Sequence, residues 1–155
     1  MKRNAFTMIE LIFVIVVLGI LAAVAIPRMT SAIDDANIGK AKSDVAALRS
    51  AIASERQARI LQGNAGYITH LDQGVTQDAA GVTIFDGNGS GVLLQYGIIT
   101  GTNEGEWLKT GADQYTFKSA GASVAFDYNA TTGRFTCDPS SGTTANDNLC
   151  KQIIY

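Results

Sequence analysis

The sequence predicts an α+β fold, in which one long N-terminal helix with a protruding apolar half packs on a small antiparallel sheet. A continuous apolar run from Leu11 to Ile26 lies near the start of the chain. A stripe of apolar residues at helical spacing follows between Ile38 and Ile52, and apolar and polar residues alternate from Tyr115 onward. The 155 residues suffice for one hydrophobic core. We therefore expect a single globular domain behind the apolar helix.

The N-terminal apolar segment covers residues 6–26, and its polar side chains are Thr7 and Glu10. As a helix, these 21 residues would be about 31 Å long, which matches one hydrocarbon core. Lys2 and Arg3 precede the segment, and basic flanking residues stay on the cytoplasmic side of a membrane. The sequence therefore predicts a single pass through an inner membrane, with the N-terminus in the cytoplasm and the rest of the chain outside.

The helical pattern continues beyond Pro27 to about Gln62. A proline disfavours helical geometry at the residue before it, although prolines also occur inside kinked helices. An alanine-rich composition supports the helix, and Gly63 is a suitable stop signal. One apolar stripe follows the predicted helix, and we expect it to pack on the sheet. The stripe consists of Ile38, Ala41, Val45, Leu48 and Ile52.

Short strands separated by turns are predicted after Gly63. Residues 63–113 are rich in Gly, Thr, Asp and Asn, which favours loops, with Val92–Tyr96 as a candidate strand. The later alternation predicts an antiparallel meander with one apolar face, which the helical stripe would cover. Its strands are expected around Tyr115 and Phe117, around Val124, Phe126 and Tyr128, and over Arg134–Cys137, with turns at Gly121 and at 129–133.

The string AFTMIELI, from Ala5 to Ile12, follows a short basic leader and opens the apolar run. It resembles the prepilin processing site of the type IV pilins and of the related pseudopilins of type II secretion and DNA uptake. The resemblance is strong up to Pro27 and covers the long helix and the C-terminal cysteines in outline. It implies a type IV pilin-like fold, with a leader at 1–5, a transmembrane or filament-core helix at 6–27 and a globular domain at 28–155.

The resemblance also implies how the chain is processed. A prepilin peptidase would cut between Ala5 and Phe6 and would N-methylate the new amine of Phe6. The usual residue before the cut is Gly, and this chain has Ala5, which is also small. Gly19 and Pro27 stand where the family has helix-loosening residues, and the stretch between them would unwind during packing into the filament.

The implied partners follow from the same family. The subunit would wait among the lipids of the inner membrane until an assembly platform extracts it. It would then join a helical homo- or hetero-polymer in the periplasm or outside the cell. The charge pattern has no long basic run, so nucleic acid is not suggested as a partner, and no cofactor is expected.

Glu10 points to function on physical grounds alone. A carboxylate in an apolar membrane helix costs a few kcal/mol, and such a residue calls for a partner. The amine freed at Phe6 lies four residues away, and the amine of a neighbouring subunit would fix the axial register by pairing with Glu10, since an unpaired buried charge is strongly unfavourable. The alternative is a carboxylate that reaches the lipid headgroups.

Two cysteines, Cys137 and Cys150, lie near the C-terminus. A disulfide between them is expected if that end lies outside the cytoplasm, and two reduced thiols are expected otherwise. A closed loop of 14 residues would stabilise the fold by about 3 kcal/mol in the chain-entropy model. We expect this loop to face outward and to serve adhesion or contact with cargo.

Two interpretations from other classes compete with a filament subunit. A secreted binding domain behind an ordinary signal peptide would use Lys2 and Arg3 as its basic region and Ala23-Val24-Ala25 as its cleavage site. Glu10 interrupts the apolar region of such a signal, and the helical pattern runs on past the supposed cut. The second competing interpretation is a signal-anchored module that never polymerises. Within the family, pilus subunit, secretion pseudopilin and DNA-uptake pseudopilin stay open.

The remaining polar features have ordinary structural interpretations. Residues 86–91 open like a calcium loop but place Gly97 where a bidentate Glu is needed, so a glycine-rich turn is expected. Asn129 lies in an N-x-T sequon with Asp127 two residues before it, which is also a polar hairpin turn. Lone His70 is expected on a surface loop and Trp107 in the core or an interface. The sequence has no recognisable nucleophile–base pair or phosphate loop, so nothing in it indicates an enzyme.

Overall fold

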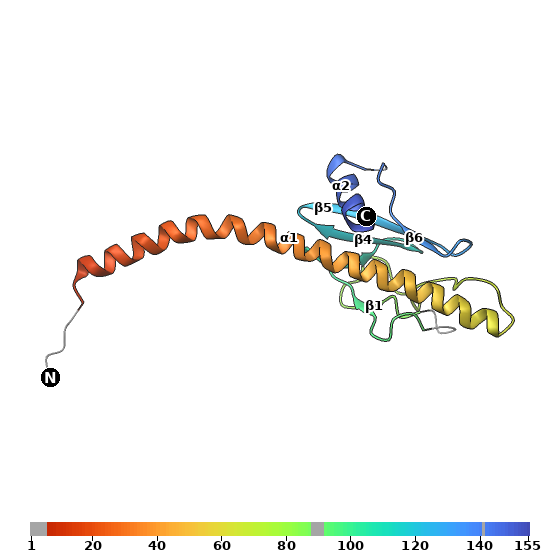
Figure 1. Cartoon of the computed structure of the whole chain (residues 1–155). Helices are drawn as coiled ribbons and strands as arrows, with labels where there is room; N and C mark the ends of the chain where they lie inside the picture. The colour runs from red at the N-terminus through yellow and green to blue at the C-terminus, as the bar shows by residue number, and fades with distance from the viewer. Residues whose placement is uncertain (1–5, 88–91, 141) are drawn as a thin grey trace, which may run out of the picture. The chain divides into compact units, whose positions relative to one another are not determined.

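The computed structural model of the chain describes residues 6–87, 92–140 and 142–155 (Figure 1). The chain forms two compact units, of which one ends at Asp35 and the other spans Ala36–Tyr155. Helix α1 (Met8–Leu61) contributes to both units. The second unit adds two small antiparallel sheets and a short C-terminal helix, which confirms the predicted α+β fold.

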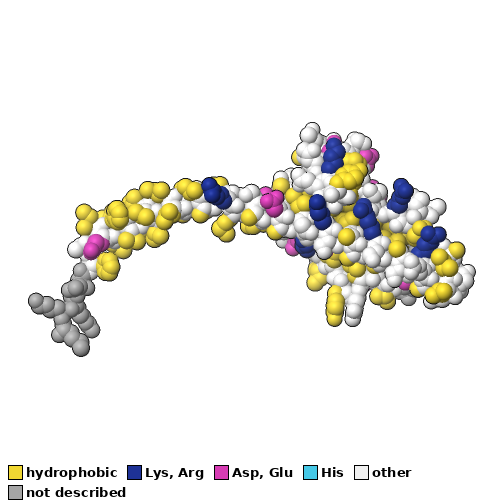
Figure 2. All heavy atoms as spheres, in the orientation of Figure 1, with side chains coloured by type: hydrophobic (Ala, Val, Ile, Leu, Met, Phe, Trp, Pro, Cys, Tyr) yellow, Lys and Arg dark blue, Asp and Glu magenta, His cyan; other side chains and the backbone are white. Residues whose placement is uncertain are grey.

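The N-terminal unit consists of the first half of α1. Its described residues from Phe6 to Ile33 are all exposed, and large apolar side chains occur on every side of the helix. Figure 2 shows these side chains along the helix surface. An 18-residue window reaches a mean hydropathy of 3.1, so α1 is long and apolar enough to cross a membrane.

Two antiparallel sheets build the C-terminal unit. The larger has the order β3-β4-β5-β6, and its strands follow one another along the chain as a meander. The strands β4, β5 and β6 were predicted, and β3 was not. The turn between β4 and β5 places Ala120 and Gly121 at φ angles of 54° and 71°, as a two-residue hairpin of type I′ requires. The strands are β1 (Thr83–Ile84), β2 (Ile98–Ile99), β3 (Trp107–Lys109), β4 (Gln114–Ser119), β5 (Ala122–Asn129) and β6 (Arg134–Thr136).

The core of this unit lies between α1 and one face of the larger sheet. Four of the five predicted stripe residues are buried, and Ile38 is half-buried, which confirms the stripe. Trp107 is fully buried, as expected, and its Nε1 donates a hydrogen bond to Asp44 Oδ2 of α1 over 3.0 Å. Burial raises the pKa of the Asp44 carboxyl, which the Trp107 hydrogen bond and Lys40 oppose. The fully buried aromatic side chains are Phe85, Trp107, Tyr115, Phe117, Phe126 and Phe135.

The predicted strand at Val92–Tyr96 is wrong, because this segment lacks strand pairing. Leu93 is buried and Leu94 is half-buried, so two successive side chains pack inward and the alternation of a strand is lost. The real strand nearby is β2, which begins two residues after Tyr96. Gly97 separates them, and a side chain there would collide with Thr83 Cγ2, so the chain turns closely against β1.

Helix α2 (Thr144–Ile154) was not predicted. Thr143 caps its start, and its side chain accepts a hydrogen bond from the backbone N–H of Asn146. Leu149, Cys150 and Ile153 are buried, and α2 lies against β5 (Figure 1). The helix therefore adds three apolar side chains to the same core.

Several smaller expectations are confirmed. Helix α1 ends at Leu61, and Gly63 follows with a φ of 84°, in the left-handed region that terminates helices. His70 is exposed, and its Nδ1 lies 3.0 Å from Asp113 Oδ1. Asn129 begins the turn between β5 and β6. Most of the expected glycine-rich turn at 86–91 lies outside the described residues.

Candidate assembly site

The first turn of α1 is closed by a reciprocal pair, Thr7 and Glu10. The backbone N–H and the hydroxyl of Thr7 each donate to Glu10 Oε2 over 2.8 Å. In return, the backbone N–H of Glu10 donates to Thr7 Oγ1 over 3.3 Å. This arrangement is a capping box, which satisfies N–H groups that a helix start leaves without partners. The spacing T-x-x-E before an apolar run is a sequence signal of such a box, which was not among the predictions.

Glu10 thus has a local partner in addition to any partner from another molecule. Both Thr7 contacts use Oε2, and within the described part of the chain Oε1 makes no hydrogen bond. Phe6, whose amine is freed by the expected cleavage, is 83% exposed. Ala5, on the other side of the expected cut, lies outside the described residues. The structure therefore leaves one carboxylate oxygen of Glu10 and most of the Phe6 side chain open to a neighbour.

Helix α1 continues through both predicted loosening positions. A side chain added at Gly19 would meet nothing within 4 Å, so no close packing in this chain requires glycine there. Pro27 has no N–H to give to the helix ladder. Beyond it, Thr30 Oγ1 donates to the Pro27 carbonyl over 2.9 Å and Ser31 Oγ to the Arg28 carbonyl over 3.1 Å. Such side-chain bonds to the preceding turn weaken helices slightly.

The structure joins Cys137 and Cys150 in a disulfide, with their Cα atoms 6.0 Å apart. Cys137 directly follows β6, and Cys150 lies inside α2, so the bond fixes the helix to the end of the sheet. Both cysteines are buried, whereas most described residues between them are exposed. The predicted pairing is confirmed, and the loop presents its surface to solvent.

A buried polar cluster stabilises the loop after α1. Lys109 Nζ lies 2.8 Å from Asp72 Oδ1, and the Tyr115 hydroxyl donates to Asp72 Oδ2 over 2.5 Å. Burial alone would raise the pKa of the Asp72 carboxyl, but the bonds from Lys109, from Tyr115 and from the Val75 N–H hold it below its usual value. Burial and the neighbouring Asp72 raise the pKa of Tyr115. No sequence signal announced this cluster, because its members lie far apart in the chain.

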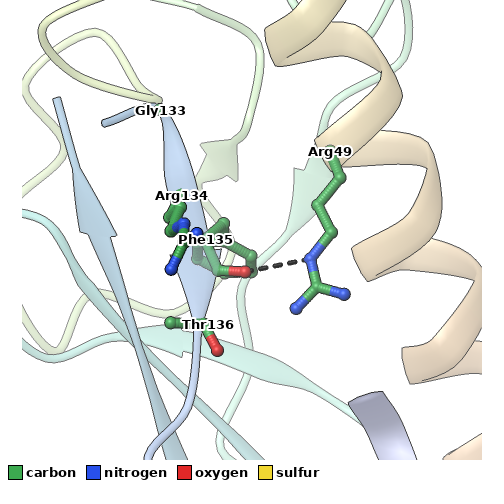
Figure 3. A pocket seen from close by; sticks show the side chains of 5 residues that line it. All are labelled: Arg49, Gly133, Arg134, Phe135 and Thr136. Carbon is green, nitrogen blue, oxygen red and sulfur yellow. Dashed lines mark hydrogen bonds between the residues drawn. The ribbon is translucent and has the colours of Figure 1, made fainter. Parts of the chain in front are cut away.

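A basic cavity lies between α1 and β6. Arg49 reaches from α1, and its Nε donates to the Phe135 carbonyl over 3.0 Å (Figure 3). Arg134 and Thr136 line the same cavity, whose volume is about 340 Å³. Arg49 thus ties the helix to the backbone of the last strand, and the contact is structural.

The comparisons with known proteins agree with this arrangement. The family model described as "prokaryotic N-terminal methylation motif" matches residues 1–26. The chain is 47% identical over 53 residues to the major component of the type IV narrow pilus of Thermus thermophilus, covering 34% of this chain and 46% of that protein. It is 41% identical over 51 residues to the type II secretion system core protein G of Pseudomonas aeruginosa, covering 33% and 36%.

A longer match joins the chain to a fimbrial protein of Pseudomonas aeruginosa, with 34% identity over 89 residues that cover 56% of this chain and 55% of that protein. The chain spans about half or less of the length of these curated relatives. No solved structure matches it. The methylation motif and the matches to pilins and to a secretion pseudopilin confirm that the chain resembles the type IV pilin and pseudopilin family.

Proposed function

We propose that this chain is a structural subunit of a type IV pilus-like filament. A prepilin peptidase cuts it between Ala5 and Phe6 and methylates the Phe6 amine, and the segment 6–27 then forms the filament core. One observation carries the proposal. The apolar helix segment within the matched methylation motif is exposed on all sides and contains one carboxylate, that of Glu10.

The exposed helix requires a second apolar environment. Each large aliphatic side chain gains about 1.5–3 kcal/mol when it is removed from water, and the N-terminal unit exposes such side chains along its whole length. Lipid meets this requirement before assembly, and the helices of other copies meet it in a filament. An inner-membrane platform would transfer the subunit from one environment to the other.

The orientation follows from charge and from the disulfide. Lys2 and Arg3 precede the apolar segment, which favours a cytoplasmic N-terminus. The bond between Cys137 and Cys150 suits an oxidising compartment on the other side of the membrane. The C-terminal unit would therefore face the periplasm and later the filament surface.

Glu10 supplies the register of the polymer. In lipid, its carboxylate is partly satisfied by Thr7, which lowers the cost of waiting in the membrane. In the filament, the methylated amine of an adjacent copy would bind the open Oε1. A pairing out of register would leave a carboxylate and an ammonium buried apart, which costs several kcal/mol.

Substitutions at the helix start test this role. Glu10→Gln keeps a capping side chain but removes the charge, whereas Thr7→Val removes two capping contacts and keeps the charge. We expect Glu10→Gln to lose sheared surface filaments, as seen by electron microscopy and immunoblot, and Thr7→Val to retain them. Mass spectrometry should find N-methyl-Phe6 as the first residue of both variants. Normal filaments from Glu10→Gln, or a mature chain that begins elsewhere, would refute the proposal.

A pseudopilin of a type II secretion system is the second candidate. The match to core protein G of Pseudomonas aeruginosa favours it, since its identity is close to that of the pilus match. Deletion of the gene separates the two functions. Loss of surface filaments with normal protein secretion supports the pilus subunit, and the reverse phenotype supports the pseudopilin.

A further inference from the structure

The turn between β5 and β6 carries a glycosylation sequon, which has no role in the proposed function. Residues 127–131 have the sequence Asp-Tyr-Asn-Ala-Thr, an N-x-T acceptor sequon with an acid two residues before the Asn. Because side chains alternate along β5, Asp127 and Asn129 share its outer face and are exposed. Tyr128 between them points inward, where its hydroxyl donates to the Ile68 carbonyl.

The local geometry frees the amide nitrogen of Asn129. Its Oδ1 accepts hydrogen bonds from the backbone N–H groups of Thr131 at 2.9 Å and Thr132 at 3.1 Å. This is an Asx turn, which places the sequon Thr beside the Asn. Within the described part of the chain, Nδ2 of Asn129 makes no hydrogen bond. The nitrogen and the exposed Thr131 therefore both face solvent.

Gly133 closes the turn that begins at Asn129. The Gly133 N–H donates to the Asn129 carbonyl over 2.7 Å, and Gly133 adopts a φ of 68°. A side chain at Gly133 would collide with the Tyr67 ring, whose hydroxyl is bound by Arg56 Nη1. The sequon therefore lies at a tight hairpin end, where Asp127, Asn129 and Thr131 are all exposed.

We propose that Asn129 is an N-glycosylation site, modified by an oligosaccharyltransferase that requires an acid two residues before the Asn. Nδ2 forms a bond to the anomeric carbon of an oligosaccharide carried on a polyprenyl diphosphate. The bond from that carbon to the diphosphate oxygen breaks, the polyprenyl diphosphate leaves, and the amide loses one proton to a base of the enzyme. Asp127 and Thr131 serve recognition and are not changed.

The cellular location needed for this reaction rests on the proposed function, because the C-terminal unit must lie outside the cytoplasm beside the membrane that holds the donor. Residues 86–90 also have the pattern Asp-x-Asn-x-Ser. Asn88 lies outside the described residues, and the proposal concerns Asn129 alone. Peptide mapping separates the two, because trypsin releases residues 119–134 as one peptide, between Lys118 and Arg134.

The test uses the full chain in two settings. In the first, the precursor is co-produced with such an oligosaccharyltransferase and a defined lipid-linked oligosaccharide. In the second, the purified, disulfide-bonded protein in detergent is incubated with the purified enzyme and the same donor. We expect the 119–134 peptide to gain the mass of the oligosaccharide on Asn129 in both settings.

Matched variants give the specificity. Asn129→Gln, Asp127→Asn and Thr131→Ala should each abolish the mass gain, whereas Thr131→Ser and Thr132→Ala should keep it. An unmodified peptide in detergent, in a reaction where a control acceptor peptide is modified, overturns the proposal. Modification in detergent but not in cells, together with free Cys137 and Cys150 thiols in cells, supports the site and overturns the proposed location instead.

Discussion

The N-terminal unit exposes its apolar side chains, whereas the C-terminal unit buries most of its own, although one helix contributes to both. Leu18 and Leu48 illustrate the difference, since the first is 57% exposed and the second is fully buried. In the first half of α1, apolar residues surround the helix; in the second half, they form a stripe that one sheet can cover. The apolar surface of the first half thus stays exposed in the folded chain, whereas that of the second half is used in folding.

The two units also differ in how far a carboxylate charge, that of Asp72 or of Glu10, is compensated within the chain. Asp72 is buried against Lys109 and Tyr115 of its own chain, so its charge is compensated on folding. Within the described part of the chain, Glu10 has a capping threonine as its partner, and one of its carboxylate oxygens is open. The Asp72 charge, which is compensated internally, supports stability, whereas in the proposed filament the partly compensated Glu10 charge would bind a second copy.

The largest expected effect on stability comes from Lys109→Met. This change leaves the Asp72 carboxylate buried without its cation, which costs about 3–5 kcal/mol in the free energy of unfolding. Chemical denaturation of the chain in detergent measures the loss. The double variant with Asp72→Asn removes the orphaned charge and should recover part of it, and a double variant that is less stable than Lys109→Met contradicts the pairing.

The same pair predicts a pH dependence. Because the folded pKa of Asp72 lies below its ordinary value of 3.8, its contribution is complete above that pH and is lost as the pH falls through the folded pKa. The stability difference between the native chain and Lys109→Met should therefore shrink on acidification below this value. A difference that grows in acid would contradict the assigned ionisation.

Paired leucine truncations test the contrast between the halves of α1 directly. Leu48→Ala should cost about 2–5 kcal/mol of unfolding free energy, because it opens a cavity in the core. Leu18→Ala should change the unfolding of the C-terminal unit by less than about 0.5 kcal/mol, as expected for a surface position. Equal losses from both variants would show that the N-terminal unit contributes to the same folded core.

The disulfide should contribute about 3 kcal/mol to the C-terminal unit. The double variant Cys137→Ser, Cys150→Ser removes the bond and leaves no unpaired thiol. The melting temperature of the double variant should fall to that of the native chain in reductant, and reductant should not change it further. If the double variant has the same melting temperature as the oxidised native chain, the bond adds no stability.

A smaller loss of stability than that from the disulfide is expected at the cap of α2. Thr143→Ala removes the side chain that accepts from the Asn146 N–H, at a cost of about 1 kcal/mol. Thr143→Ser keeps an acceptor and serves as the control. Hydrogen exchange of the first α2 amides should accelerate in the alanine variant only, and equal exchange in both would contradict the capping role.

Periodic features of the fold were predictable from the sequence. The stripe on α1, the meander from Tyr115 to Thr136 and the helix end before Gly63 all follow from local spacing and turn residues. The two-residue strands β1 and β2 and the short β3 are too brief to show a period, so they were missed. Val92–Tyr96 has strand-forming residues, yet packing of adjacent leucines overrode that preference.

The site was predictable where chemistry is local in the chain. The motif around Phe6 and Glu10 was visible, and the Thr7 cap was visible but overlooked. Helix α2 is polar on average, but its apolar residues Leu149, Cys150, Ile153 and Ile154 lie at helical spacing on one face, so this helix was readable from the sequence and was missed. The Asp72 cluster depends on long-range packing, because its members come from a loop and two strands.

Trp107 has a practical consequence for experiments. It is the one tryptophan in the chain, and it is buried with its indole N–H on Asp44 of α1. Its fluorescence therefore reports whether the second half of α1 stays docked on the sheet, and the first half of the helix contains no residue that emits beside it. Emission that is steady while subunits polymerise, and red-shifted on denaturation, would let one optical signal separate filament growth from loss of the fold.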